Sequence, residues 1–295
     1  MFSNILVIGT GMIGSSVALA LKKSGASSVI IGFDTNKKNL AIAKKKNIVD
    51  IAVDKLAIGI KKSQLIVIAS PINSYRNIFQ TINQTESQAL ITDVGSTKAL
   101  VISQAEKELK YPQLFIPAHP IAGREKPGPD YADGQLFINQ YVIITPIKNN
   151  RKSDIKKIKN FWQQTGAKIN LMTVDDHDEI FAGVSHLPHL ISMALVHYLL
   201  QKRESNQYLK YAAGGFRDFT RIAASDPQMW HDVFLANKKI LLKNLSQFEK
   251  SLKSFRKMIE SGKDTIHQKE LFQTLAKISE KRNRWQHKNL TNSKN

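Results

Sequence analysis

The sequence predicts an α/β domain with a mostly parallel sheet, followed by an all-helical domain. Short apolar runs rich in β-branched residues alternate with amphipathic stretches of helical length through the first half of the chain. From Val174 onward the strand pattern is lost, and only helical periodicity continues. A chain of 295 residues is long enough for two such domains with a sizeable core.

The strands expected in the first domain are short and almost entirely apolar. They are Ile5–Gly9, Val29–Asp34, Leu65–Ala69, Ala89–Asp93, Leu114–Ala118, Tyr141–Thr145 and Ala167–Met172. The expected helices cover residues 12–24, 36–46, 74–83, 97–109 and 152–165. Apolar strands separated by helices of this length form parallel sheets covered on both faces, so we expect this domain to span residues 1–173.

The second domain is expected to span residues 174–285 and to be helical over residues 175–201, 205–224, 227–260 and 268–284. Asp226 and Pro227 form a helix start, with the acid as N-cap and the proline at the first helical position. The helix that follows carries an apolar seam: Leu241, Leu245, Phe248, Leu252, Phe255 and Ile259. This seam favours a homodimer formed through the C-terminal helices, with intramolecular packing as the alternative. Residues 286–295 are expected to form a basic tail.

Composition excludes several classes of protein. There is no cysteine, hence no disulfide and no thiolate metal site, and we expect no metal at all. No uninterrupted apolar run approaches the roughly 18 residues of a membrane span, and the first residues lack the basic region and cleavage site typical of a signal peptide. We therefore expect a cytoplasmic protein without a membrane partner. The net charge of +19 raises the possibility of nucleic-acid binding, but only nine of the 43 basic residues are arginines and the lysines are scattered. We therefore predict no nucleic-acid partner.

A glycine-rich motif follows the first expected strand. Gly9 permits a tight turn, Gly11 lets the backbone approach a pyrophosphate, and Gly14 lets the helix pack closely on the strand. Free N–H groups at the start of the helix would then face the phosphates. The motif predicts a Rossmann-type dinucleotide-binding domain. The expected cofactor contacts are Gly9, Thr10, Gly11, Met12, Ile13, Gly14, Asp34 and Ser70.

Asp34 ends the second expected strand, twenty residues after Gly14. Its carboxylate can accept both ribose hydroxyls of adenosine and would repel a 2′-phosphate, which favours NAD over NADP. Lys37 and Lys38 follow closely and would weaken that preference. The alternative interpretation is an ordinary strand–helix turn followed by an aspartate that caps the next helix.

Ligands of open α/β sheets bind at the carboxyl ends of the strands, where Ser70, Ser96 and His119 are expected. A neutral imidazole at position 119 can take a proton from a hydroxyl while hydride leaves the same carbon. Ser96 could share that hydroxyl, orient the imidazole, or cap the helix that follows. The loop over residues 124–134 is either a movable lid or a static surface loop.

Two further clusters lie in the helical half. Pro188 lies between His186 and His189 and predicts a kinked helix, with His189 interpreted as a core histidine. If residues 205–224 form one helix, Arg217 and Arg221 share a face. One arginine would pair with the neighbouring Asp218, which leaves the other for a substrate carboxylate. An internal network without a ligand is the alternative.

These motifs together resemble the prephenate and arogenate dehydrogenases of tyrosine biosynthesis. The resemblance runs from Ile5 to about Trp230 and is carried by "GTGMIG", "DVGSTK", "HPIAGRE", "HDEIFAGVSHLPH" and "GGFRDFTRIAASDPQMW". It implies a cytoplasmic homodimer with a dinucleotide-binding domain and a helical dimerisation domain. The activity it implies is oxidation of a cyclohexadienol by NAD(P) with loss of carbon dioxide.

The resemblance also implies roles for individual residues. His119 matches the catalytic histidine that accepts the hydrogen bond of the ring hydroxyl, and Ser96 matches a serine that shares it. Arg221 matches the arginine that holds a substrate carboxylate. His186 matches a residue that contacts the substrate and the feedback inhibitor, and Glu125 matches an acid at the pocket entrance. The residues that match positions lent by the partner subunit are Gly214, Met229 and Trp230.

Position 124 departs from the family pattern, since Arg124 stands where related chains carry a small polar residue. An arginine there opposes the ammonium of arogenate and suits the oxo acid of prephenate. The expected reaction is therefore NAD-dependent conversion of prephenate to 4-hydroxyphenylpyruvate. The alternatives are an arogenate or dual-specificity cyclohexadienyl dehydrogenase, more remotely a β-hydroxyacid dehydrogenase-like oxidoreductase, and a basic protein that only senses NAD.

Overall fold

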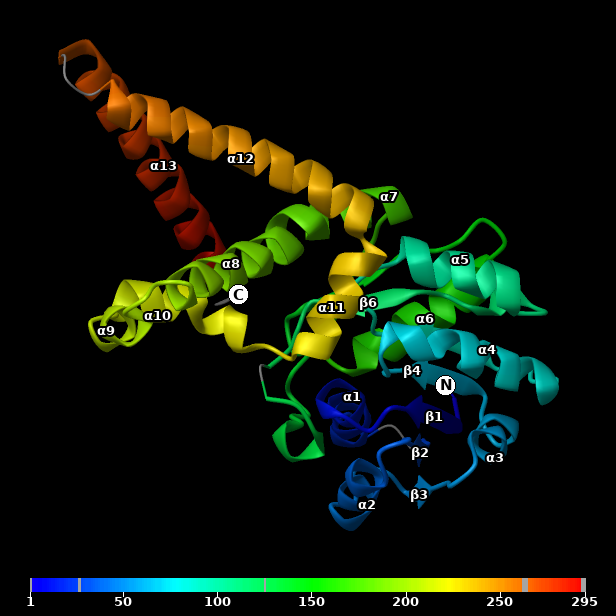
Figure 1. Ribbon diagram of the computed structural model, residues 1–295. Helices are drawn as coiled ribbons and strands as arrows, with labels where there is room; N and C mark the ends of the chain where they lie inside the picture. Colours follow the sequence, from blue (N-terminus) through cyan, green and yellow to red (C-terminus); the bar gives the residue numbers. More distant parts are fainter. Residues whose placement is uncertain (1, 26–27, 125, 262–264, 293–295) are drawn as a thin grey trace. The chain divides into compact units, whose positions relative to one another are not determined.

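The computed structural model describes residues 2–25, 28–124, 126–261 and 265–292 (Figure 1). The chain divides into two compact units, Met1–Ile240 and Leu241–Asn295. The smaller unit contains most of α12 (Lys238–Glu260) and all of α13 (Thr265–Asn292). The predicted domain boundary at residue 173 lies inside the larger unit and stays a prediction.

The larger unit begins with a five-stranded parallel sheet of order β3-β2-β1-β4-β5. Its strands are β1 (Asn4–Ile8), β2 (Val29–Phe33), β3 (Ile51–Ala52), β4 (Leu65–Ile68) and β5 (Leu90–Asp93). The helices between them are α1 (Met12–Lys23), α2 (Lys37–Lys45), α3 (Leu56–Lys61), α4 (Tyr75–Gln84) and α5 (Ala99–Glu108). The sequence missed only the short β3 and α3 in this region.

The sheet is covered on both faces, as the sequence predicts. Along β1, Ile5 and Val7 belong to one buried cluster, and Leu6 and Ile8 belong to a second. Successive side chains of a strand point to opposite faces, so the two clusters are the two sides of the sheet. A strand buried on both faces needs the continuous apolar run that the sequence shows.

A second sheet contains β6 (Ala118–Pro120), β7 (Tyr141–Ile144) and β8 (Lys168–Leu171), with α6 (Lys152–Gln164) before β8. β6 is antiparallel to β7, which pairs in parallel with β8. The predicted strand Leu114–Ala118 is therefore wrong. Phe115 makes only an isolated bridge to Ile91. Pro117 has no N–H to donate, which interrupts the pairing before β6 begins. His119 thus lies inside a strand rather than after one.

The predicted helix over residues 175–201 is broken, as its proline indicates. The chain forms α7 (Val174–Phe181), a π-helical turn (Ala182–His186) and α8 (Leu187–Leu200). Pro188 cannot donate to the carbonyl four residues before it, and the wider π turn accommodates this lost hydrogen bond. The π turn carries His186 at its last position.

The other predicted long helices are each divided. Residues 205–224 form α9 (Ser205–Lys210), α10 (Gly214–Thr220) and a 3-10 turn (Arg221–Ala224). The glycine pair at 214–215 disfavours a continuous helix. Arg217 therefore lies in α10 and Arg221 opens the 3-10 turn that follows, so the single helix predicted over residues 205–224 is wrong. Residues 227–260 divide at Asn237 into α11 (Pro227–Ala236) and α12, and the carboxylate of Asp226 accepts the Met229 N–H as the predicted N-cap (2.7 Å).

Two glycines of the first motif are required by packing. Gly9 has φ +93°, and a Cβ there would lie 2.4 Å from the carbonyl oxygen of Ala69. A Cβ on Gly14 would lie 2.0 Å from the carbonyl oxygen of Gly9. A Cβ on Gly11 would have no described atom within 4 Å. Gly11 thus borders open space, whereas the other two permit the turn and the close helix–strand contact.

We predict that Gly14→Ala destabilises the fold and that Gly11→Ala does not. Because the added methyl group would overlap backbone, Gly14→Ala should lower the free energy of unfolding by about 1–3 kcal/mol or more. Gly11→Ala, the matched control, should change it by less than about 1 kcal/mol. Urea unfolding measures both. Equal destabilisation by the two variants would contradict this assignment of the glycines.

Candidate active site

The end of β2 is joined to the glycine-rich loop by Asp34. Its carboxylate accepts the backbone N–H of Thr10 at 2.7 Å, the Thr10 hydroxyl at 3.0 Å and the N–H of Asn36 at 2.8 Å. The acid is half-buried, and its two oxygens still have lone pairs that can accept ribose hydroxyls. Lys37 lies 3.9 Å from the Asp54 carboxylate, so its charge is partly engaged elsewhere.

The loop and the start of α1 have the geometry of an anion site. No side chain among the described residues caps α1 at Gly11, which leaves the first N–H groups of the helix for a ligand. Met12 and Ile13 open that helix. Ser70, after β4, shares a 2.8 Å hydrogen bond with Ser74 and lies against the loop, since its nitrogen is 3.0 Å from a Cβ built on Gly9. These residues fit a dinucleotide pyrophosphate.

A buried ion pair fixes the backbone next to His119. Lys98 and Asp93 are fully buried, with Nζ 2.7 Å from Oδ2. Lys98 Nζ also donates to the carbonyl of Ala118 (2.7 Å), and Asp93 Oδ1 accepts the Ala118 N–H (2.9 Å). Tyr75 donates its hydroxyl to Asp93 at 3.0 Å, and burial raises the pKa of this phenol well above its usual value. Both backbone polar groups of residue 118 are therefore held by one pair of side chains.

His119 begins a chain of buried polar contacts. Its Nδ1 lies 2.9 Å from Nε2 of His177, and Nδ1 of His177 lies 2.7 Å from Oδ1 of Asp178. Burial lowers the pKa of His119 well below the usual range, and the neighbouring His177 and Lys98 lower it further. His119 is consequently neutral near pH 7 and able to accept a proton.

Asp178 caps α5 from a distant part of the chain. Its carboxylate accepts the backbone N–H groups of Lys98 and Ala99, both at 2.9 Å. Burial opposes ionisation of this acid, but hydrogen bonds from His177 and the two N–H groups outweigh it, and its pKa falls below the usual value. The alternative that Ser96 caps this helix is wrong, because α5 begins at Ala99 and Lys98 occupies the N-cap position. Sequence reasoning gave no role to Asp178 or His177; only the "HDEIFAG" motif marked them.

A second buried group surrounds His186. Trp230 Nε1 and His186 Nε2 make no hydrogen bond of good geometry among the described residues, although the backbone of Ser96 lies beside the His186 ring. Asn237 approaches Nδ1 of His186 at 3.4 Å and donates to the carbonyl of Asp178 at 2.9 Å. Buried polar atoms without partners are rare, so a polar ligand group near Trp230 and His186 fits this position.

His189 is half-buried, and its contacts resemble those of a core histidine. Its ring stacks on Trp230 with centroids 3.7 Å apart, and its Nδ1 hydrogen-bonds the carbonyl of Ser185 at 2.8 Å. Trp230 is buried within its own chain, where His189, His186 and Phe234 pack against its indole. The π turn and α8 therefore place both histidines against the same indole.

The loop after His119 is tied to the nucleotide-binding part of the molecule. Arg124 pairs with Asp133 at 2.5 Å, and the Asp133 N–H donates to Ser16 of α1 at 3.0 Å. Lys46 pairs with Asp130 at 2.5 Å. These contacts match the static-loop alternative better than a lid. Glu125 lies outside the described residues.

The other predicted substrate residues lie in the helical half. Gly214 begins α10 and Arg221 begins the following 3-10 turn, and both are exposed. Met229, in α11, is also exposed. The Ser192 hydroxyl of α8 donates to the carbonyl of Phe219 at 3.0 Å, which ties α10 to α8. The roles of these residues remain predictions.

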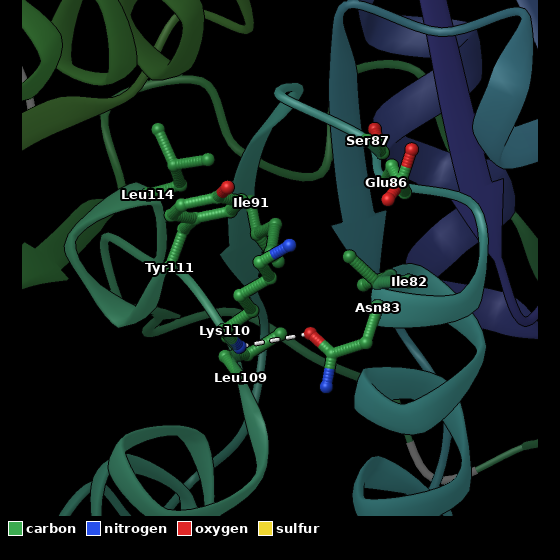
Figure 2. Close-up of a pocket in the computed structure, with 9 residues that line it drawn as sticks. All are labelled: Ile82, Asn83, Glu86, Ser87, Ile91, Leu109, Lys110, Tyr111 and Leu114. Carbon is green, nitrogen blue, oxygen red and sulfur yellow. Dashed lines mark hydrogen bonds between the residues drawn. The ribbon is translucent and has the colours of Figure 1, made fainter.

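Figure 2 shows a hollow whose lining includes none of the site residues described above. It is lined by Ile82 and Asn83 at the end of α4 and by Leu109 and Tyr111 after α5, and Asn83 accepts the Lys110 N–H at 2.8 Å. The lining also includes Ile91, near the start of β5. His119 instead follows Ala118, whose N–H donates to Asp93 at the carboxyl end of β5. The described residues also contain no group of three or more acidic or histidine side chains that could hold a metal ion.

A dinucleotide-type loop and a neutral histidine anchored near the carboxyl edge of one sheet define a nucleotide-dependent dehydrogenase. Residues 17–171 match the family model of the prephenate dehydrogenase nucleotide-binding domain, and residues 173–277 match that of the prephenate dehydrogenase dimerization domain. The chain belongs to the prephenate dehydrogenase family.

Known proteins agree with this assignment. Prephenate dehydrogenase of Bacillus subtilis is 35% identical over 263 residues, which cover 88% of this chain and 71% of that protein. Cyclohexadienyl dehydrogenase of Zymomonas mobilis is 33% identical over 88% of this chain and 89% of its own length. The crystal structure of A. aeolicus prephenate dehydrogenase with hydroxyphenyl propionate and NAD+ matches with a TM-score of 0.89 at 35% identity, covering 96% of this chain and 98% of that one.

One helical stretch in the described part of the chain, Val174–Leu200, is long and apolar enough by length and composition to cross a membrane. It comprises α7, the π turn and α8, and it carries the buried side chains of His177, Asp178 and His186. The stretch lies within the segment that matches the dimerization domain.

We predict that stability falls in mild acid partly through His186. Burial lowers its pKa to about 4, so the folded state resists a proton that the unfolded chain takes up near pH 6.5. Its stabilising contribution is present above about pH 6.5 and is lost as the pH falls toward 4. Between pH 7 and pH 5 the loss is about 2 kcal/mol.

Urea unfolding of His186→Gln at the two pH values measures this contribution. The drop in unfolding free energy between pH 7 and pH 5 should be smaller in the variant by about 2 kcal/mol. His197→Gln, at an exposed histidine of α8, is the control and should leave the drop unchanged. An identical drop in His186→Gln and the unaltered chain would contradict the assignment.

Proposed function

We propose that the chain catalyses the NAD-dependent oxidative decarboxylation of prephenate to 4-hydroxyphenylpyruvate in tyrosine biosynthesis. The observation that carries the proposal is the buried, neutral His119, which is held near the carboxyl edge of the parallel sheet. The glycine-rich loop follows β1 at the same edge of that sheet. Ile13 of that loop region and Ala122, three residues after His119, pack on the same core cluster. The similarity to B. subtilis prephenate dehydrogenase supports the substrate.

The proposed cofactor is NAD. Gly9 and Gly11 would admit its pyrophosphate at the start of α1, and Asp34 would accept its ribose hydroxyls. When bound, NAD supplies the hydride acceptor of the reaction. The NAD+ in the related A. aeolicus enzyme supports this choice, and the acid at position 34 disfavours a 2′-phosphate.

The chain's own residues would orient the substrate and move one proton. Nε2 of His119 takes the proton of the ring hydroxyl as hydride leaves the carbon that bears it, and Ser96 shares the contact. A positioned base of this kind typically contributes about 10²- to 10⁴-fold to the rate. Loss of carbon dioxide leaves an aromatic ring whose oxygen takes the proton back. Arg221 would hold a substrate carboxylate, beside His186 and Trp230.

Dual specificity is the second candidate function. The cyclohexadienyl dehydrogenase of Z. mobilis matches nearly as well as the prephenate enzymes. The salt bridge to Asp133 also neutralises part of the charge that Arg124 would set against the ammonium of arogenate. We still expect prephenate to be preferred, since Arg124 stays half-exposed and cationic.

A homodimer is proposed because the helical parts leave large apolar side chains exposed. In the larger unit, α8 is mostly apolar in sequence, yet only its Ser192 is buried. The exposed large apolar side chains in the helical part of this unit include Val184, Tyr198, Leu200, Tyr208, Leu209, Tyr211, Phe219 and Leu235. In the smaller unit they are Leu242, Leu252, Ile259, Phe272, Leu275, Ile278 and Trp285. A second copy would cover such a surface and could lend Gly214 and Met229 to the site. We also propose that the enzyme is soluble and cytoplasmic.

Nicotinamide reduction at 340 nm, with prephenate and arogenate each tried with NAD and NADP, tests the function. The highest kcat/KM is expected for prephenate with NAD, because Asp34 excludes the 2′-phosphate and Arg124 opposes the ammonium. A clear preference for arogenate would contradict the role of Arg124. No reduction with either substrate would contradict the proposed function.

His119→Asn tests the catalytic base. Because the asparagine side chain has no basic nitrogen in place of Nε2 of His119, kcat should fall by about 10²- to 10⁴-fold. The dissociation constant for NAD, measured by calorimetry, should not change, since the glycine-rich loop is intact. Turnover close to that of the unaltered enzyme would rule out His119 as the base.

A further inference from the structure

We propose that Asp178 and His177 are positioning residues that fix the tautomer of His119, so that its Nδ1 carries the proton and its Nε2 is the free base. The proposal rests on the function proposed above, in which Nε2 accepts the substrate hydroxyl proton. His177 and Asp178 do not themselves need to touch the substrate. They act through the geometry of the three-residue chain of contacts from His119 to α5.

The chain of contacts begins at the anion of Asp178. Two backbone N–H groups at the start of α5, those of Lys98 and Ala99, donate to the two carboxylate oxygens. The positive end of a helix dipole favours a negative charge at this position. An ionised carboxylate only accepts hydrogen bonds. The nitrogen of His177 at 2.7 Å, Nδ1, must therefore be the donor of that contact.

The direction of hydrogen-bond donation at His177 in turn fixes the direction at His119. A neutral imidazole has one N–H and one acceptor nitrogen, so a proton on Nδ1 of His177 leaves its Nε2 as an acceptor. Nε2 lies 2.9 Å from Nδ1 of His119, which must then donate. His119 consequently carries its own proton on Nδ1. Its Nε2 is unprotonated, as a base that receives a hydroxyl proton must be.

Packing prevents the rings from leaving this arrangement. The ring of Phe181 lies 4.8 Å from that of His119 and 4.6 Å from that of His177, measured between centroids. The backbone before His119 is clamped by the fully buried Asp93–Lys98 pair. The other tautomer of His119 would point its Nε2–H at the substrate oxygen, and its unprotonated Nδ1 could not donate to Nε2 of His177. The same chain of contacts lets Asp178 stabilise the imidazolium that forms when Nε2 takes the proton.

Two substitutions of His177 separate orientation from packing. In His177→Gln, the side-chain amide can donate to Asp178 and present its oxygen to Nδ1 of His119, which preserves the tautomer. In His177→Met, a side chain of similar length offers no comparable acceptor. We expect kcat with prephenate to fall by about 10²-fold or more in His177→Met and clearly less in His177→Gln, with KM nearly unchanged in both. Equal losses of kcat in the two variants would overturn the proposal, because only the glutamine amide offers Nδ1 of His119 an acceptor comparable to Nε2 of His177.

Histidine tautomers in the free enzyme provide a test that does not need turnover. In ¹⁵N-histidine-labelled protein, long-range ¹H–¹⁵N spectra should show His119 protonated at Nδ1, and His177→Met should shift population to the Nε2–H form. His119→Asn assigns the resonance. A His119 protonated at Nε2 in the unaltered enzyme would overturn the proposal even if prephenate is oxidised. The expected tautomer in an enzyme that oxidises no cyclohexadienol would instead contradict the proposed function and leave this assignment standing.

Discussion

The site depends on a carboxylate and an ammonium buried together 2.7 Å apart. Asp93 ends β5, Lys98 precedes α5, and between them they bind both backbone groups of Ala118 in β6. Burial lowers the pKa of Lys98, and the adjacent Asp93 opposes that shift. Losing either partner would leave an uncompensated buried charge, which typically costs about 3–5 kcal/mol. Burying two charges has a desolvation cost, and here the buried pair fixes the backbone next to His119.

The helical half supplies the hydrogen-bond partners of His119 and of the start of α5. Asp178 in α7 accepts the first N–H groups of α5, and its neighbour His177 meets His119. Asn237 donates to the carbonyl of Asp178 and approaches His186, which also holds α7 in place. The nucleotide-binding fold alone would therefore present His119 without its hydrogen-bond partner. The contacts of α7 with α5 and His119 therefore both hold α7 in place and orient the proposed catalytic base.

Local features were predictable from the sequence, and long-range ones were not. The Gly9 and Gly14 positions, the acid at the end of β2 and the break at Pro188 follow from short-range sterics and hydrogen bonding. The strand predicted before His119 failed because Pro117 interrupts the pairing. The contact of Asp178 with α5 spans about eighty residues and leaves no local pattern, so the cap was assigned to Ser96 as one alternative. Periodicity also cannot reveal a two-residue strand such as β3.

A structure of the enzyme with NAD and 4-hydroxyphenylpyruvate bound tests the central claim most directly. The account predicts that the phenolic oxygen lies within about 2.6–3.2 Å of Nε2 of His119, while Nδ1 keeps its contact with His177. It also predicts the guanidinium of Arg221, from either subunit, at the product carboxylate. A phenolic oxygen beyond hydrogen-bond reach of Nε2, with the ring of His119 turned away from the product, would contradict it.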